Sequence, residues 1–279
     1  MDYKTVMTAV TDLTLDTNVL HAAITFAKAH DAHLEVLCLG LDRTEVGFYY
    51  AGGNLALQQQ FRTEAEAEAQ ALEAGVRLIL ENSDALWSVQ TLAVPIATAG
   101  HAVSQLARYS DVVLLGQPYT LERGFQAEGI LEGALFDAHA AVLVIPPNVS
   151  AVPQPKNVVV AWNSSAEALS AIRAALPILA AASTVSITII DPPQHGPDRS
   201  DPGGQLSLML SRHGVRAEVA VMAKTMPRVS DVLCRHVEDR NAGMLVMGAY
   251  GHSRFRESIL GGATRDMLQC AGIPMLMAR

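Results

Sequence analysis

Short apolar runs recur along the chain, and polar residues followed by helix-like stretches separate them. The first run covers residues 5–10, and a similar run covers residues 157–162. Each is followed directly by polar capping residues and then by an Ala- and Leu-rich segment, which is the pattern of a strand, a turn and a helix. The same local pattern therefore occurs at two places in the chain.

The match between the two halves continues through the rest of the sequence. The further pairs of apolar runs are 34–39 with 185–190, 111–116 with 243–248, and 141–146 with 273–278. These runs show little alternation of apolar and polar residues, as is typical of strands buried on both faces. Strands that alternate with helices form right-handed βαβ units. We therefore predict an α/β protein made of two tandem domains, each an open parallel sheet with helices on both faces.

A proline-rich segment separates the two halves. Residues 146–155 contain four prolines. Because proline has no amide donor and a fixed φ, we expect a linker here rather than a core element. The predicted division is a first domain over 1–147, a linker over 148–155 and a second domain over 156–279.

Composition restricts the classes of partner and the location. Half of the 279 residues are apolar and the net charge is −8, which favours a packed protein and argues against nucleic acid or an anionic membrane surface as a partner. The uncharged apolar stretch 174–190 is too short for a membrane span. The first residues lack the features of a signal peptide, so we expect a cytoplasmic protein.

Cys38, Cys234 and Cys270 lie in apolar contexts and are expected to be buried free thiols. The spacing of the histidines predicts no metal site.

The second half carries the most specific motif. Ligands of open parallel sheets bind at the carboxyl ends of the strands, and the loop after run 243–248 contains Gly248, Gly251 and Gly261 with the spacing Gly-x2-Gly-x9-Gly. Gly248 and Gly251 are expected to let the backbone adopt positive φ close to a ligand. Residues 261–264 precede an expected helix over 265–271, whose free amides favour an anion.

Positive charge and hydroxyl groups accompany these glycines. Thr264 offers a hydroxyl donor, and Arg254, Arg256 and Arg265 bring positive charge, although an exposed surface role for these arginines is equally compatible with the sequence. Residues 1–147 hold 7 basic and 18 acidic residues, whereas the remainder hold 13 basic and 10 acidic. The basic surplus thus lies in the half that carries the glycines, and together these features predict a phosphate-binding loop.

With this motif the chain resembles the universal stress protein family in its tandem form, whose domains are Rossmann-like and adenine-nucleotide α-hydrolase-like. The resemblance covers nearly all of both halves, and its diagnostic motif is confined to the three glycines. It implies ATP, with Mg²⁺ as a companion ion, as the ligand of the second half. Asn163 stands where the family has an Asp near the adenosine, and Gly262 stands where it has a Ser or Thr. The nucleotide-binding residues that the resemblance implies are Ala161, Trp162, Asn163, Ile190, Met247, Gly248, Tyr250, Gly251, His252, Gly261, Gly262, Ala263 and Thr264.

The first half departs from this motif. After Gly116, Tyr119 and Glu132 stand at the positions of the second and third glycines. A carboxylate at a phosphate position repels the ligand, and a tyrosine crowds the backbone. We therefore expect this half to be a structural partner that does not bind nucleotide in the family's way. The resemblance also implies that the last strands of the two halves, 141–145 and 273–277, pack side by side as an intramolecular pseudo-dimer, and it leaves a homodimer open.

Three functions follow from these observations. The first is a non-enzymatic stress-response module that binds ATP or a related adenine nucleotide, with at most slow hydrolysis and no catalytic residues to assign. The alternative is an interaction protein of the same fold that binds no nucleotide and acts through partners or a small apolar ligand. An enzyme acting on an adenylated or phosphorylated metabolite ranks last, because we find no general base or nucleophile to assign.

Overall fold

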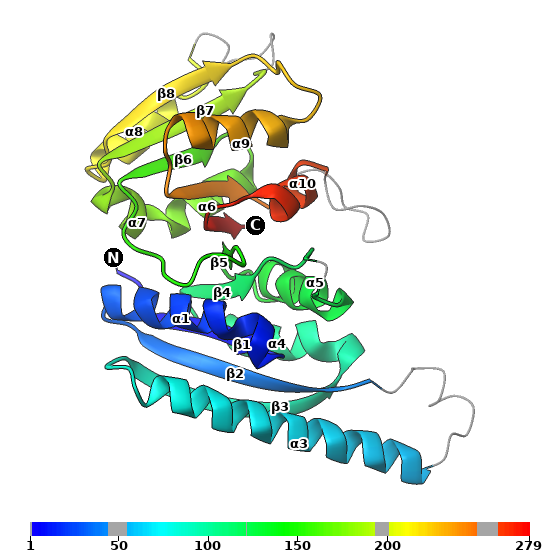
Figure 1. Cartoon of the computed structure of the whole chain (residues 1–279). Helices are drawn as coiled ribbons and strands as arrows, with labels where there is room; N and C mark the ends of the chain where they lie inside the picture. The colour runs from blue at the N-terminus through cyan, green and yellow to red at the C-terminus, as the bar shows by residue number, and fades with distance from the viewer. Residues whose placement is uncertain (1, 44–54, 121, 193–200, 250–261) are drawn as a thin grey trace.

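The computed structural model describes residues 2–43, 55–120, 122–192, 201–249 and 262–279. Within these residues ten strands form one continuous sheet, and helices cover both of its faces (Figure 1). The predicted fold class, open parallel sheets with helices on both faces, is confirmed.

The elements of the two halves follow one another in the same general order. The strands of the N-terminal half are β1 (Thr5–Val10), β2 (His33–Asp42), β3 (Leu86–Pro95), β4 (Val112–Gly116) and β5 (Val142–Ile145). The strands of the C-terminal half are β6 (Asn157–Ala161), β7 (Thr184–Ile190), β8 (Ala217–Met222), β9 (Met244–Gly248) and β10 (Met275–Ala278). The described helices are α1 (Leu13–Ala29), α3 (Leu55–Leu80), η1 (Ile96–Thr98), α4 (Ala99–Ala107), α5 (Phe125–Glu132), η2 (Gly133–Asp137), α6 (Ala166–Ala174), α7 (Leu176–Ala181), α8 (Gly204–Arg212), α9 (Val229–Asp239) and α10 (Gly262–Cys270).

The strand order is the same in both halves. From the outer strand to the middle of the sheet, the order is β3-β2-β1-β4-β5 in the N-terminal half and β8-β7-β6-β9-β10 in the C-terminal half. All pairs within a half are parallel. Each half thus brings the carboxyl ends of its strands to a single edge, which is where open parallel sheets bind ligands.

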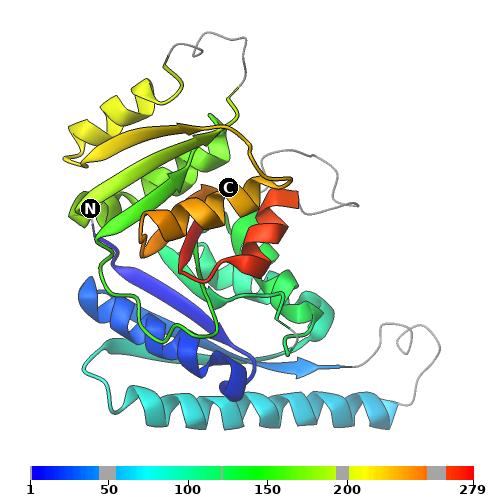
Figure 2. The same cartoon turned by 45° about the horizontal axis from the view of Figure 1, so that its top comes forward.

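The halves meet through their last strands. β5 pairs antiparallel with β10, with Leu143 opposite Leu276, and Figure 2 shows the two halves on either side of this strand pair. The expectation that the last strands lie side by side is therefore correct. Antiparallel pairing relates the two halves by an approximate two-fold rotation.

Strands buried on both faces explain the continuous apolar runs. Successive residues of β1 alternate between two hydrophobic clusters, with Val6 in one and Met7 in the other. The first cluster packs against α1, α3, α6, α7 and α8, and the second against α4, α5, α9 and α10. The eight runs that the sequence predicts as strands all form strands, whereas the outer strands β3 and β8 were not predicted.

The proline-rich segment contributes to the core, which corrects the expectation of a linker without core positions. Val152 is 5% exposed and belongs to the first hydrophobic cluster. Gln154 donates a side-chain hydrogen bond to the Ile178 carbonyl at 2.9 Å. Prolines prevent regular secondary structure here, but they leave the neighbouring side chains able to pack against α1 and α7.

The three cysteines differ in burial. Cys38 is buried as expected, but Cys234 is only partly buried and Cys270 is exposed, so the prediction of three buried thiols was wrong for two of them.

None of the described helices combines the length and the apolar composition that a membrane span requires.

Candidate functional site

The carboxyl ends of β6, β7 and β9 lie next to one another at one edge of the sheet. Ala161 is in register with Met247 on one side and with Thr188 on the other, and the Trp162 amide donates to the Thr188 carbonyl at 2.9 Å. The edge therefore brings together the predicted residues Ala161, Trp162, Asn163, Ile190, Met247 and Gly248. The predicted residues Tyr250, Gly251, His252 and Gly261 lie outside the described residues.

A tight turn connects β6 to α6 at this edge. Ser164 adopts a positive φ of 61°, and the Asn163 Oδ1 accepts a hydrogen bond from the Ser165 amide at 3.2 Å. The Ser165 hydroxyl then accepts from the Ala168 amide at 3.1 Å and caps α6. The side-chain Oδ1 of Asn163 is thus hydrogen-bonded within the turn. The side-chain NH₂ of this exposed residue is therefore the group that can donate to a ligand.

Close packing against α6, and not a positive φ, requires a glycine at position 248. Among the described glycines only Gly214 has a positive φ, so the expectation for Gly248 was wrong. A Cβ on Gly248 would lie 2.5 Å from the Ala168 amide nitrogen and 2.8 Å from the Glu167 carbonyl carbon. The absent side chain lets β9 approach the first turn of α6, whose free amides carry the partial positive charge of a helix N-terminus.

Helix α10 begins earlier than the sequence predicted. Its first residue is Gly262 instead of Arg265. Gly262 and Ala263 thus lie in the first turn, where backbone amides have no acceptor within the helix. Gly262 and Ala263 are exposed, and a Cβ on Gly262 would meet no atom of the described residues within 4 Å. The Thr264 side chain is buried, so the groups that this turn offers to a ligand are backbone amides.

Arg265 contacts the other half of the molecule. Its guanidinium carbon lies 5.1 Å from the centre of the Tyr119 ring, which is a cation–π distance. The positive charge of Arg265 therefore interacts with the Tyr119 ring. Arg254 and Arg256 lie outside the described residues.

In the N-terminal half, the protein's own side chains occupy the corresponding edge. The Arg123 Nη2 lies 2.7 Å from the Asp16 Oδ1, and both side chains are almost fully buried. Asp16 accepts hydrogen bonds from the Thr11 and Asp12 amides at 2.9 and 3.2 Å, and Arg123 donates to the Leu15 carbonyl at 2.8 Å. A Cβ on Gly116 would lie 2.4 Å from the Arg123 guanidinium. An internal anion, Asp16, thus binds the backbone amides that follow β1.

The turn after β1 also caps α1. The Asp12 carboxylate accepts from the Thr14 and Leu15 amides at 2.8 and 3.3 Å. The side chain of Thr14 lowers the pKa of Asp12 below its usual value, and these backbone hydrogen bonds add to the effect. Asp12 is therefore engaged as a helix cap.

Two residues that replace motif glycines in this half form a polar cluster. The Tyr119 hydroxyl donates to the Glu128 carboxylate at 2.7 Å. Burial, together with the neighbouring carboxylates of Glu128 and Asp137, raises the pKa of Glu132. Tyr119 and Glu128 also line a small cavity of about 260 Å³ that Gln269 of α10 helps to enclose.

Sequence reasoning missed the Asp16–Arg123 pair. One signal for Asp16 was available, because it lies in an apolar helical segment with Val19 and Leu20 one turn later, where a buried carboxylate requires a cationic partner. Nothing in the sequence identifies Arg123 as that partner, since the two residues are far apart in the chain.

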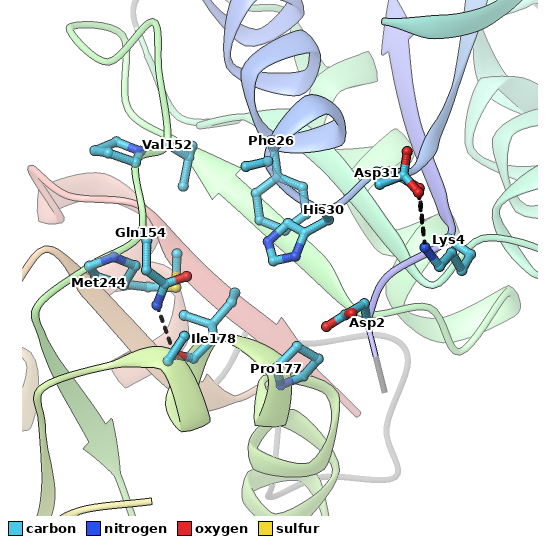
Figure 3. A pocket seen from close by; sticks show the side chains of 14 residues that line it. Asp2, Lys4, Phe26, His30, Asp31, Val152, Gln154, Pro177, Ile178 and Met244 are labelled. Carbon is cyan, nitrogen blue, oxygen red and sulfur yellow. Dashed lines mark hydrogen bonds and ion pairs between the residues drawn. The ribbon is translucent and has the colours of Figure 1, made fainter.

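A larger cavity lies at the opposite edge of the sheet, between the two halves (Figure 3). Its volume is about 500 Å³. Phe26, Ile178 and Met244 supply apolar lining, and Lys4 and Asp31 form an ion pair of 3.6 Å at its rim. It adjoins the amino ends of the strands and is therefore separate from the edge that carries the glycine motif.

The C-terminal half of the chain is similar to universal stress proteins. The sequence model of the universal stress protein family matches residues 155–279. A universal stress protein from Synechocystis sp. is 32% identical over 76 residues, which cover 27% of this chain and only 25% of that relative.

Solved structures share the fold over nearly the full length. A universal stress protein from Archaeoglobus fulgidus has a TM-score of 0.73 at 15% identity, with 98% of both chains covered. A structure described as a putative universal stress protein from Pseudomonas aeruginosa has a TM-score of 0.60 at 10% identity, with 99% of this chain and 93% of that chain covered. The C-terminal half, residues 155–279, therefore matches the universal stress protein family, and the full length of the chain has the fold of a solved universal stress protein.

Proposed function

We propose that the C-terminal half binds an adenine nucleotide, with ATP as the first choice, and that the protein is a stress-response regulatory module without a catalytic role beyond slow hydrolysis. The observation that carries the proposal is the approach of Gly248, at the carboxyl end of β9, to the first turn of α6. A second helix, α10, begins at Gly262, directly after the glycine motif. Free amides and the helix dipole at such ends favour a phosphate group.

Each part of the nucleotide has a proposed partner at this edge. The amides of Gly262 and Ala263 would bind phosphate oxygens, and the side-chain NH₂ of Asn163 would donate to the adenosine part. The half-buried side chains of Trp162 and Ile190 offer apolar surface to the base. Tyr250, Gly251, His252 and Gly261 remain proposed ligand-binding residues from the sequence motif, and Mg²⁺ would neutralise part of the phosphate charge when it is bound.

The N-terminal half serves in this proposal as a structural partner. The Asp16 carboxylate already accepts the amides that follow β1, and a nucleotide phosphate would meet its negative charge. The intramolecular pairing of β5 and β10 then joins one binding half to one closed half.

A second function is supported by the cavity at the opposite edge. Its volume of about 500 Å³ suits a small ligand. Phe26, Ile178 and Met244 offer it apolar surface, and the rest of the lining includes the charged residues Asp2, Lys4 and Asp31. This is the alternative in which the fold acts without a nucleotide.

Isothermal titration and native mass spectrometry separate the two functions. ATP and AMP, each titrated with Mg²⁺ into the purified full chain, should give saturable heat, and native spectra should show one nucleotide bound per chain. No heat at millimolar ATP, together with retention of an apolar molecule in native spectra, would favour the second function.

A further inference from the structure

Two cysteines that are distant in the sequence come together on neighbouring helices. Cys234 lies on α9 and Cys270 is the last residue of α10. Their Sγ atoms are 3.1 Å apart. A disulfide bond is about 2.0 Å long, so the sulfurs need to approach by only about 1 Å to form one.

The three thiols of the chain differ in accessibility. Cys270 is exposed, Cys234 is partly buried and Cys38 is buried. Burial, with a smaller effect from Glu73, raises the pKa of Cys38 to about 12, which keeps that thiol protonated and unreactive. Only the Cys234–Cys270 pair therefore combines contact between sulfurs with access from solvent.

The two members of the pair differ in reactivity. Burial, the hydrogen bond with Cys270 and nearby carboxylates raise the pKa of Cys234 to about 12. Cys234 is thus held as a thiol, while the exposed Cys270 is the sulfur that a dissolved oxidant reaches first.

We propose that Cys234 and Cys270 form a reversible thiol–disulfide modification site that responds to hydrogen peroxide. The Cys270 thiolate attacks one peroxide oxygen, so that an S–O bond forms, the O–O bond breaks and the departing hydroxide takes up a proton as water. The Cys234 sulfur then attacks the resulting Cys270 sulfenic acid, the S–S bond forms, the S–O bond breaks and the Cys234 proton leaves with the oxygen as a second water. Two thiols are oxidised and one peroxide is reduced.

The disulfide would connect α9 to α10 across 36 residues of sequence. Such a cross-link removes freedom from the unfolded chain and raises the melting temperature. The inference goes beyond the proposed function and does not depend on it, since it needs only the contact between the two sulfurs. Transient disulfides of this kind occur in proteins that sense oxidants in reducing compartments.

The site is tested on the reduced full chain treated with hydrogen peroxide and then blocked with iodoacetamide. We expect the count of free thiols to fall from three to one, with Cys38 remaining. Without reductant, a tryptic digest should contain residues 229–235 linked to residues 266–279, and dithiothreitol should reverse the link. The melting temperature should rise on oxidation by several degrees.

Serine variants provide the controls. Cys38→Ser should form the same cross-link, whereas Cys234→Ser should accumulate a Cys270 sulfenic acid that dimedone traps. Cys270→Ser should retain its two thiols under the same treatment, and matching circular dichroism spectra of the reduced variants verify folding. Conversion of Cys270 to sulfinic acid in the wild-type chain without the internal link would overturn the proposal, as would disulfide dimers through Cys270 in its place.

Discussion

The Asp16 carboxylate and the Arg123 guanidinium lie 2.7 Å apart, and their side chains are only 3% and 12% exposed. The pair lies at the carboxyl edge of the N-terminal half, where Asp16 accepts the amides that follow β1. In the C-terminal half the turn after β6 instead carries the exposed Asn163. The same strand order thus produces one edge that is closed by an internal ion pair and one that presents polar groups to solvent.

Removal of Arg123 should strongly destabilise the protein. Arg123→Met leaves the Asp16 carboxylate buried without its cation, which costs about 3 to 5 kcal/mol when one member of a buried pair is lost. Urea unfolding followed by circular dichroism measures this change in the free energy of unfolding.

The double variant Asp16→Leu/Arg123→Met provides the matched control. Since no charge is left unpaired, it should recover most of the lost stability. If Arg123→Met is as stable as the wild type, the ion pair does not stabilise this edge.

Gly248 and Gly262 should respond in opposite ways to alanine. A Cβ on Gly248 would lie 2.5 Å from the backbone of α6, whereas a Cβ on Gly262 would meet no atom within 4 Å in the part of the chain that the structure describes. Gly248→Ala should therefore lower the free energy of unfolding by about 1 to 3 kcal/mol. Gly262→Ala should leave it unchanged or raise it by up to about 1 kcal/mol, because alanine favours the helix.

Thermal unfolding of the two glycine variants checks this difference. An equal loss of stability in both would mean that Gly248 is not required for the approach of β9 to α6.

His236 should make stability depend on pH. Its Nε2 lies 3.1 Å from the Ser186 hydroxyl in the core. Burial, followed by the nearby Arg240 charge, lowers the pKa of His236 below 6.5. Below about pH 6.5 the unfolded chain takes up a proton that the folded chain resists, so the free energy of unfolding falls as the pH drops toward the folded pKa and levels off below it.

Urea unfolding at about pH 8 and about pH 5.5 tests this dependence. The loss of stability over this interval should be smaller in His236→Gln than in the wild type, because glutamine does not titrate. An identical loss in both proteins would assign the pH dependence to other groups.

The inner part of the sheet could be predicted from the sequence, whereas its edges could not. The inner strands are buried on both faces and therefore appear as continuous apolar runs. The outer strand β8 leaves Val219 and Val221 40% and 54% exposed, and Leu86 of β3 is 65% exposed. Because some side chains of each outer strand face water, polar residues interrupt the apolar ones. The sequence of these strands therefore contains no long apolar run.

Contacts between distant residues explain what the site analysis missed. Asp16 with Arg123, and Cys234 with Cys270, are brought together only by the packing of helices that a single sequence does not specify. The turn at Asn163 and the glycine at Gly248 could be located from the sequence because they directly follow apolar runs. The reason for Gly248 still required the structure, since the backbone of α6 that excludes a side chain belongs to another element.

The proposed nucleotide site is tested most directly by Ala263→Glu. Ala263 is exposed in the first turn of α10, where a carboxylate suits the helix dipole but repels a phosphate. Gln59→Glu adds the same charge to an exposed position of α3 in the other half and serves as the control. Isothermal titration with ATP and Mg²⁺ should show affinity reduced at least about tenfold in Ala263→Glu and unchanged in Gln59→Glu. Equal affinity in Ala263→Glu and the wild type, or no binding to the wild type, would contradict the site.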